Sequence, residues 1–367
     1  MSEGAGTGEI NYLDMLPSSE VPWGGISSKL FVKKASGKVY QLAGNKLDNG
    51  QTDLADLTEY RKDPNKNLFS WEEYSFNDEP ESAELPEVVI IGCHGFNGRS
   101  EPYARMFKML GGYRGKAKMR MVAIREPGHG ETSAKLDYNN VLNQICEIPS
   151  VQKAKHIILH GSSMGGAIAI GLAMDERVAD RTRRLMVDGP MQEPIKRIRD
   201  AIKIGLLVAI DSVIPGVEGR QKRAQIEERF PIKGMPFLFG TLRLLEGLEV
   251  AENFFKTIPE FDGLIEEFVA RKSEQGQKRG MDVSWVFGTN DGITKNGEYD
   301  RRMRALTMAL GGDINDYKTE LPEEVHAWGL RDEPKWYEWF YARTAASLDS
   351  VIKGSNEITD KILTDRE

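Results

Sequence analysis

Short apolar runs and stretches of helical spacing alternate along most of the chain. The runs at 87–93 and 156–159 are continuous and rich in β-branched residues, which is typical of parallel strands buried on both faces of a sheet. The same pattern predicts further strands at 120–124, 184–187 and 282–287, and helices at 101–110, 141–148 and 165–174. Alternating strands and helices predict an α/β fold with a mostly parallel, doubly wound sheet.

The N-terminal part of the chain has a different pattern. Residues 30–32 and 38–42 are short runs of strand-forming residues that we expect to pair as a hairpin, and residues 69–76 form a third such run. Residues 1–27 carry too few apolar side chains to offset the entropy lost on ordering, so we expect a flexible tail there.

The alternation of strands and helices stops at Pro190 and resumes at Asp282. Between these points, apolar residues recur at helical spacing. We therefore predict a helical cap over residues 195–280. It would be inserted into an α/β core that comprises residues 28–194 and 281–367.

Composition and charge narrow the class of protein. The chain has 367 residues, of which 40% are hydrophobic, enough to bury one large core with an appended unit. Its formal net charge is -7 and its basic residues are interspersed among acidic ones, so we expect no nucleic-acid partner. The longest strongly apolar stretch, 204–214, contains Asp211 and is too short to span a bilayer, so no membrane span is predicted.

Cysteine usage and the N-terminus indicate the compartment. The two cysteines, Cys93 and Cys146, are too few and too far apart for a disulfide framework, which fits a reducing environment. Residues 1–20 lack the positive start and the apolar stretch of a secretory signal. We therefore expect a cytoplasmic protein.

A glycine-rich motif lies between a predicted strand and a predicted alanine-rich helix. The segment from Gly161 to Gly166 fits the pattern G-x-S-x-G only when Ser163, not Ser162, is the central serine. Gly161 and Gly165 permit a tight turn that lifts the Ser163 hydroxyl above the sheet at the start of the helix. An ordinary Gly/Ser-rich turn is the alternative, but the position between strand and helix favours a nucleophile.

A second motif, His-Gly-Phe at 94–96, follows the first buried strand. An acyl-transfer enzyme of this architecture needs a backbone N–H at this point, directed at the developing oxyanion. We predict that the amide of Phe96 supplies one donor and the amide of Met164 the other. A phosphate-binding loop is excluded, because the glycines are spaced one residue too far apart and Arg99 stands where lysine is required.

Three local patterns together resemble the α/β-hydrolase superfamily, in particular its capped, esterase-like members. Residues 94–96 resemble the oxyanion loop, residues 126–132 resemble the D-x-x-G-H-G-x-S turn after the next strand, and residues 160–166 resemble the nucleophile elbow. The resemblance covers roughly residues 30–350, apart from the predicted cap. It implies an α/β-hydrolase fold and a Ser-acid-His triad.

The chain departs from the family pattern in the G-H-G turn. The usual acidic residue is displaced, and Arg125 and Glu126 lie near its place. His129 in this turn and His94 in the oxyanion loop are interpreted as structural. Ser163 separates the chain from dehalogenases and epoxide hydrolases, which carry aspartate at the elbow.

The family order of the triad, Ser then acid then His, implies the two remaining members. His326 is the one histidine that follows the elbow, and is therefore implied as the general base. Asp291 lies in a turn directly after a predicted strand and resembles the acid-bearing loop of the family. Asp188 also precedes a glycine at the end of a predicted strand, and is the alternative acid.

These assignments predict a serine hydrolase that cleaves a small or medium carboxylic ester through an acyl-enzyme intermediate. The expected partner is this small-molecule substrate, with no cofactor and no metal, since no metal-ligand motif is present. The same triad also supports cleavage of amides, thioesters and carbon–carbon bonds. Two alternatives remain open: a non-catalytic binding protein of this fold, and an acyltransferase.

Overall fold

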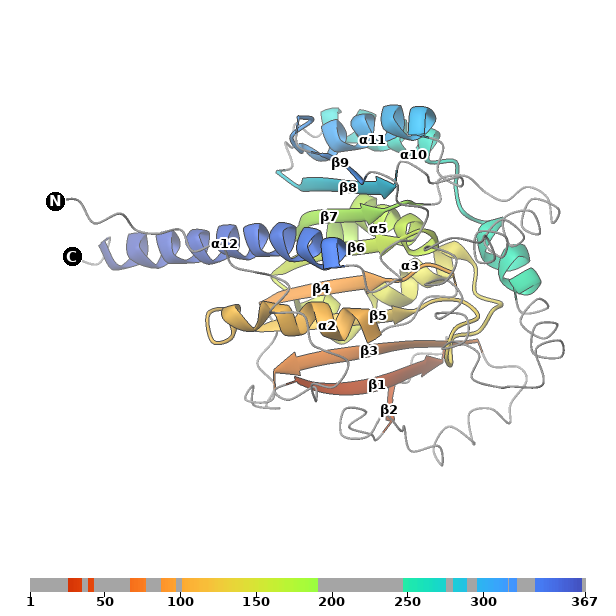
Figure 1. Cartoon of the computed structure of the whole chain (residues 1–367), viewed down its shortest axis with the longest axis horizontal. Helices are drawn as coiled ribbons and strands as arrows, with labels where there is room; N and C mark the ends of the chain where they lie inside the picture. Colours follow the sequence, from red (N-terminus) through yellow and green to blue (C-terminus); the bar gives the residue numbers. More distant parts are fainter. Residues whose placement is uncertain are drawn as a thin grey trace.

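The computed structural model describes residues 26–34, 39–42, 67–76, 87–96, 101–190, 247–274, 280–288, 296–315, 317–321 and 334–364. These residues form a nine-stranded sheet with helices on both faces (Figure 1). The strands are β1 (Ile26–Lys34), β2 (Val39–Leu42), β3 (Leu68–Phe76), β4 (Val88–Cys93), β5 (Met119–Arg125), β6 (His156–Ser162), β7 (Thr182–Asp188), β8 (Asp282–Gly288) and β9 (Lys318–Leu321).

The strand order is β2-β1-β3-β5-β4-β6-β7-β8-β9. The first three strands pair antiparallel with their neighbours, and the six strands β4 to β9 run parallel to one another. This confirms the predicted mostly parallel sheet and the predicted N-terminal hairpin, in which Leu30 pairs with Leu42.

Helices connect and flank the parallel strands. They are α2 (Glu101–Met109), η2 (Leu110–Tyr113), α3 (Tyr138–Cys146), α4 (Pro149–Lys153), α5 (Met164–Met174), α6 (Glu176–Ala179), η3 (Ala251–Phe255), α10 (Phe261–Glu274), α11 (Asn296–Leu310) and α12 (Pro334–Thr364). The chain moves outward from β4 to β5 through α2, then crosses back to β6 through α3. Because such crossovers are right-handed, the reversal puts α2 on one face and α3 and α5 on the other.

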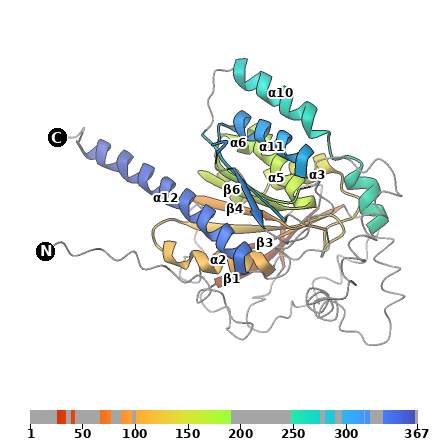
Figure 2. The same ribbon diagram turned by 45° about the horizontal axis from the view of Figure 1, so that its top comes forward.

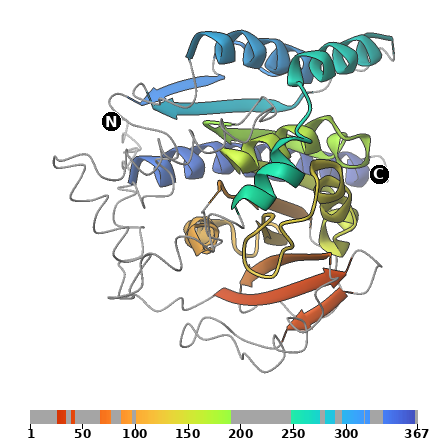
Figure 3. The same cartoon turned by 90° about the vertical axis from the view of Figure 1, so that its right-hand side faces the viewer.

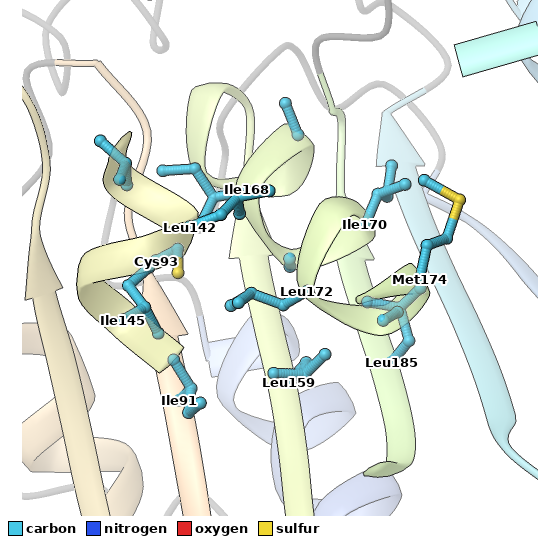
Figure 4. Close-up of a cluster of buried hydrophobic side chains, with 14 of the residues drawn as sticks. Ile91, Cys93, Leu142, Ile145, Leu159, Ile168, Ile170, Leu172, Met174 and Leu185 are labelled. Atoms are coloured by element: carbon cyan, nitrogen blue, oxygen red, sulfur yellow. The ribbon is translucent and has the colours of Figure 1, made fainter. Parts of the chain in front are cut away.

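Alternate residues of the central strands enter two different cores. In β4, Ile91 and Cys93 join the cluster beneath α3 and α5, whereas Val88 and Ile90 join the cluster beneath α2 and α12. Figure 4 shows the first of these clusters, in which side chains of α3 and α5 pack on β4, β6 and β7. The continuous apolar runs are therefore buried on both faces, as predicted.

The long C-terminal helix α12 crosses the sheet on the side opposite α5 and extends beyond it (Figure 2). Buried Arg184 of β7 anchors it by donating to the Ser347 hydroxyl at 2.6 Å. The same guanidinium donates to Ser284 at 2.8 Å and to Asp282 at 2.9 Å, both in β8. One arginine thus ties two strands to the helix, and its charge is matched by a carboxylate.

Part of the predicted cap, residues 247–274, is described. Helix α10 packs beside α11, and its residues Phe261, Ile265 and Phe268 belong to the same buried cluster as the central strands. Residues 191–246 lie outside the described residues, so the cap boundaries stay a prediction. Of the predicted tail at 1–27, residues 1–25 also lie outside them, whereas Ile26 and Ser27 belong to β1 and pair with β3. The tail prediction is therefore wrong for these two residues, because the edge of the sheet orders them. Within the described part of the chain, every helix is too short or too polar to cross a bilayer.

Candidate active site

Ser163 is the junction between β6 and α5, and its backbone is strained. Its φ of 51° and ψ of -112° lie in a region that residues with a side chain rarely adopt. Among the described residues it is the one non-glycine with positive φ. The surrounding strand and helix hold it there: its amide donates to the Asp188 carbonyl at 2.8 Å, and its carbonyl accepts from the Gly166 amide at 3.0 Å.

Two glycines of the motif make this turn possible. A side chain on Gly161 would overlap the carbonyl of Gly165, and a side chain on Gly165 would overlap the carbonyl of Cys93. The helix therefore begins in backbone contact with both its own strand and the neighbouring strand β4. This close approach is the physical reason for glycine at both positions.

The two serines of the motif have different surroundings. Ser162 is the last residue of β6, and its hydroxyl donates to the carboxylate of buried Asp188 at 3.0 Å. Ser163 lies beyond the strand and is 8% exposed. The two serines thus differ in their position relative to the strand, and the assignment of Ser163 as the nucleophile stays a prediction.

The loop at 94–96 passes directly beside the elbow. A side chain on Gly95 would lie 3.1 Å from Cβ of Ser163. Both segments follow neighbouring parallel strands, β4 and β6, at the point where the strand order reverses. Open α/β sheets bind their ligands at this switch point, outside the carboxyl ends of the strands.

The two predicted oxyanion donors, Phe96 and Met164, lie in these adjoining segments. Met164 is the first residue of α5, so its amide has no carbonyl to bond within the helix. Phe96 makes edge-to-face contacts with His129 at 5.6 Å and with Phe255 at 5.9 Å between ring centroids. The structure thus brings Ser163, Met164 and Phe96 together.

Asp291 and His326 lie outside the described residues. Along the sequence, Asp291 comes three positions after Gly288, where β8 ends. His326 comes five positions after Leu321, where β9 ends. The alternative acid, Asp188, is described and is engaged by both serines of the elbow.

Helical residues 247–255 lie beside the turn after β5 (Figure 3). Val250 packs against Gly128 so closely that a side chain on this glycine would collide with it. Phe255 contacts Phe96, as described above, and Gly247 lies near the tip of the same ring. A segment of the predicted cap therefore contacts the predicted oxyanion loop.

The turn after β5 is held by a buried ion-pair network. Arg125 donates to Glu72 of β3 and to Glu131 of the turn, each at 2.7 Å. Its carbonyl accepts from the Thr132 hydroxyl at 2.6 Å, and this hydroxyl is 2.8 Å from that of Ser70. Arginine, in place of the family's acid, thus links the turn to the sheet.

Histidines 94 and 129 support the loop. His94 is buried, its Nδ1 donates to the Gly95 carbonyl at 2.8 Å, and its ring lies 4.9 Å from that of His129. Burial is the main reason that the pKa of His94 is lowered to about 3, so this ring is uncharged at neutral pH. These contacts match the structural role predicted for both histidines.

Glu126, which lies near the displaced acidic residue of the turn, is buried, and the sequence did not predict this burial. The side chain is 0% exposed, and burial raises the pKa of its carboxyl well above the usual range. The sequence carried one signal, a carboxylate directly after a buried strand, but turns after strands often carry exposed carboxylates.

In the described part of the chain, no group of three or more His, Cys, Asp or Glu could hold a metal ion.

No protein-family model matches the sequence. Two curated proteins share a short stretch with it. The putative esterase/lipase 2 of Mycoplasma genitalium is 27% identical over 109 residues, which are 29% of this chain and 38% of that protein. The protein of the same name from Mycoplasma pneumoniae is 26% identical over 122 residues, 31% of this chain and 43% of that one. The chain thus spans less than half the length of these relatives.

The arrangement of strands and helices is shared with a solved structure. The peroxisomal alpha-beta-hydrolase Lpx1 of Saccharomyces cerevisiae is similar with a TM-score of 0.55 and 10% identity, covering 89% of both chains. A carboxylesterase of Nitrososphaera gargenis is similar with a TM-score of 0.48 and 13% identity, covering 78% of this chain and 98% of that one.

Proposed function

The chain is an α/β-hydrolase by fold, and from this premise we propose that it is a serine hydrolase acting on small or medium carboxylic esters. Ser163 is the nucleophile, His326 the general base and Asp291 the carboxylate that orients it. The amides of Phe96 and Met164 form the oxyanion hole. The two Mycoplasma relatives carry the name putative esterase/lipase, which agrees with this substrate class.

One observation carries the proposal: Ser163 alone, among the described non-glycine residues, has a strained positive φ, and it does so beside the loop at 94–96. A backbone outlier of this kind costs about 1–3 kcal/mol. An ordinary turn avoids that cost by placing glycine there. A serine kept in this conformation lies at the start of α5 and beside the loop at 94–96, where an attacking group and an oxyanion site are needed together.

The sheet topology supports the other two triad members. Strands β6, β8 and β9 are parallel, so their carboxyl ends share one edge of the sheet. Asp291 and His326 follow two of these ends within three and five residues, as noted above, and Ser163 follows the third. Chain length limits how far such residues lie from their strand ends, to about 3.5 Å per residue.

The proposed reaction proceeds in two halves. Oγ of Ser163 attacks the ester carbonyl carbon while His326 takes its proton, and the carbonyl electron pair moves onto oxygen beside the two amides. The tetrahedral intermediate collapses, His326 returns the proton to the leaving alkoxide, and an acyl-enzyme remains. Water then attacks the acyl carbon, with His326 again as base, and the acid and free Ser163 are released.

We also propose that residues 195–280 contribute a helical cap. Support comes from residues 247–255, which lie against Phe96 and the turn after β5. Such a segment encloses the acyl group and excludes water from the reaction. Because α10 shares the main core, only part of the predicted range is free to act as a lid.

The test is labelling with a fluorophosphonate probe, followed by turnover of p-nitrophenyl esters of increasing acyl length. We expect the wild type to be labelled at Ser163, and Ser163→Ala to lose labelling and turnover with its fold intact. Ser162→Ala is the matched control and should keep both within about tenfold, since it removes only one hydrogen bond. Absent labelling in the wild type would favour a non-catalytic binding protein. Ester turnover that rises with added alcohol or amine acceptor would indicate an acyltransferase.

A further inference from the structure

Glu126, the first residue after β5, lies where three motifs meet. Its Oε1 is so close to Gly165 that a side chain on this glycine would collide with it, and the Cys93 carbonyl lies against the same glycine. Its Oε2 is 3.9 Å from Nδ1 of His94. The carboxyl therefore fills the junction between the loop after β4, the turn after β5 and the first turn of α5.

The buried carboxyl group of Glu126 lacks hydrogen bonds within the described part of the chain. Neither oxygen has a hydrogen-bond partner among the described residues, and the side chain is fully buried. A carboxylate without partners in such surroundings is strongly destabilised, whereas the carboxylic acid is not. Burial accordingly raises the pKa of Glu126 well above the usual range of a carboxyl, which favours the uncharged acid.

Among the described residues, no charged group forms an ion pair with Glu126. Burial mainly, and Glu126 to a smaller extent, raise the pKa of the Tyr103 phenol in α2, which carries no positive charge. His94 is uncharged, as shown above, and His129 packs on its ring. The pKa of the Cys93 thiol is raised, mainly by burial and to a smaller extent by the charge of Glu126. The guanidinium of Arg125 is engaged with two other glutamates at 2.7 Å each. The first turn of α5 has no titratable side chain.

We propose that Glu126 is a positioning residue that works only as the uncharged acid: it holds the loop at 94–96 against the elbow, and its ionisation impairs the oxyanion site. This role rests on the proposed serine hydrolase function. The oxyanion forms beside the first amides of α5, where the helix dipole favours negative charge. An ionised Glu126 would lie against the same helix start, and its negative charge would repel the oxyanion.

The first test is the pH dependence of kcat for p-nitrophenyl acetate, from about pH 6 to about pH 10. For the wild type we expect kcat to fall by about 10- to 100-fold on the alkaline side, as Glu126 ionises. Glu126→Gln is uncharged at every pH, and should keep kcat within about threefold of the wild type at pH 7 without the alkaline fall. Glu176→Gln, at an exposed carboxylate of α6, is the charge control and should retain the fall. An alkaline fall that persists unchanged in Glu126→Gln would overturn the proposal.

The second test reports the proton without activity. The infrared difference spectrum between wild type and Glu126→Gln should contain the carbonyl stretch of a protonated carboxylic acid at neutral pH. When the pH of the wild-type sample is raised, this band should disappear. The pH at which half of the band is lost should equal the midpoint of the alkaline fall in kcat. Absence of the band at neutral pH would refute the uncharged acid, even if a variant failed to fold. Failed fluorophosphonate labelling of the wild type would instead refute the serine hydrolase, and with it the role of Glu126.

Discussion

Asp188 accepts hydrogen bonds from both serines of the elbow: its carbonyl from the Ser163 amide at 2.8 Å, and its carboxylate from the Ser162 hydroxyl at 3.0 Å. The end of β7 thus braces the turn between β6 and α5. A carboxylate engaged in this way has a structural task at the elbow, and Asp291 remains the acid that we propose for the triad.

Replacing each aspartate in turn separates these roles. Asp291→Asn should keep the side-chain shape but favour the wrong imidazole tautomer of His326, lowering kcat by on the order of 10⁴-fold, as in the trypsin-type triad. Asp188→Asn still offers an oxygen to Ser162 and should cost far less. The measurement is kcat for one p-nitrophenyl ester with both variants. A larger fall in kcat for Asp188→Asn than for Asp291→Asn would assign the triad acid to Asp188. Small falls in both variants would mean that neither aspartate is the triad acid.

A methyl group at Gly165 should distort the elbow, because it would overlap the Cys93 carbonyl and approach Glu126. For Gly165→Ala we expect a loss of about 2 kcal/mol in the free energy of unfolding and a fall of about 100-fold in kcat. Gly263→Ala in α10 is the control, since nothing lies within 4 Å of its added methyl. It should raise stability by up to about 1 kcal/mol without changing kcat. Wild-type kinetics in Gly165→Ala would contradict the close packing of elbow and loop.

The contact between Phe255 and Phe96 links the segment at 247–255 to the predicted oxyanion loop. Phe255→Leu should loosen Phe96 and lower kcat, in addition to a loss of stability of about 1 kcal/mol. Phe268→Leu in α10 removes the same atoms from the same buried cluster and serves as the matched control. It should lose similar stability while kcat stays near the wild-type value. Equal kcat in the two variants would mean that the contact does not position the loop.

His160 should make the protein sensitive to acid. It is fully buried, its Nδ1 lies 3.0 Å from the Tyr103 hydroxyl, and it is surrounded by aromatic rings that include Trp336 and Phe340. Burial lowers its pKa from 6.5 to about 3. The unfolded chain therefore binds a proton below about pH 6.5 that the folded protein cannot, and stability is lost as the pH falls from there towards about 3.

Urea unfolding between about pH 7 and about pH 4 tests this sensitivity. Each buried histidine of this kind makes the free energy of unfolding fall by up to about 1.4 kcal/mol for each unit that the pH is lowered. His160→Asn should reduce the slope by that amount, whatever its stability at pH 7. His156→Asn, at a partly exposed histidine of the same strand, should reduce it less. An unchanged slope in His160→Asn would show that the buried ring is not the cause.

Local sequence signals determined most of the parallel core. The apolar runs at 87–93 and 156–159 became β4 and β6, and the alternation between them established the fold class. The turn at Ser163 could also be predicted, because the spacing of the glycines around it reflects backbone contacts within a few residues. The predicted ends of helices and strands were less accurate. β6 continues from Leu159 to Ser162 because β7 pairs with these residues, which no local pattern indicates.

One helix start and two further elements differ from the predictions. The N-cap of α3 is Asp137, whose side chain accepts from the Asn140 amide at 2.7 Å, so the helix begins three residues before the predicted start. β9 was not predicted, because its Lys-Thr-Glu-Leu sequence is polar at the edge of the sheet. Helix α11 likewise has a weak apolar pattern.

Only the tertiary structure decided the environment of three groups near the elbow. Glu126 is buried because β4, β5 and α5 converge on it, and Asp188 is engaged because β6 and β7 end side by side. Phe96 is covered by residues 247–255, which follow it by about 150 positions in the chain. Composition and spacing report contacts between near neighbours. Burial and partnership of these groups depend on segments that are distant in sequence, and become defined only when the sheet assembles.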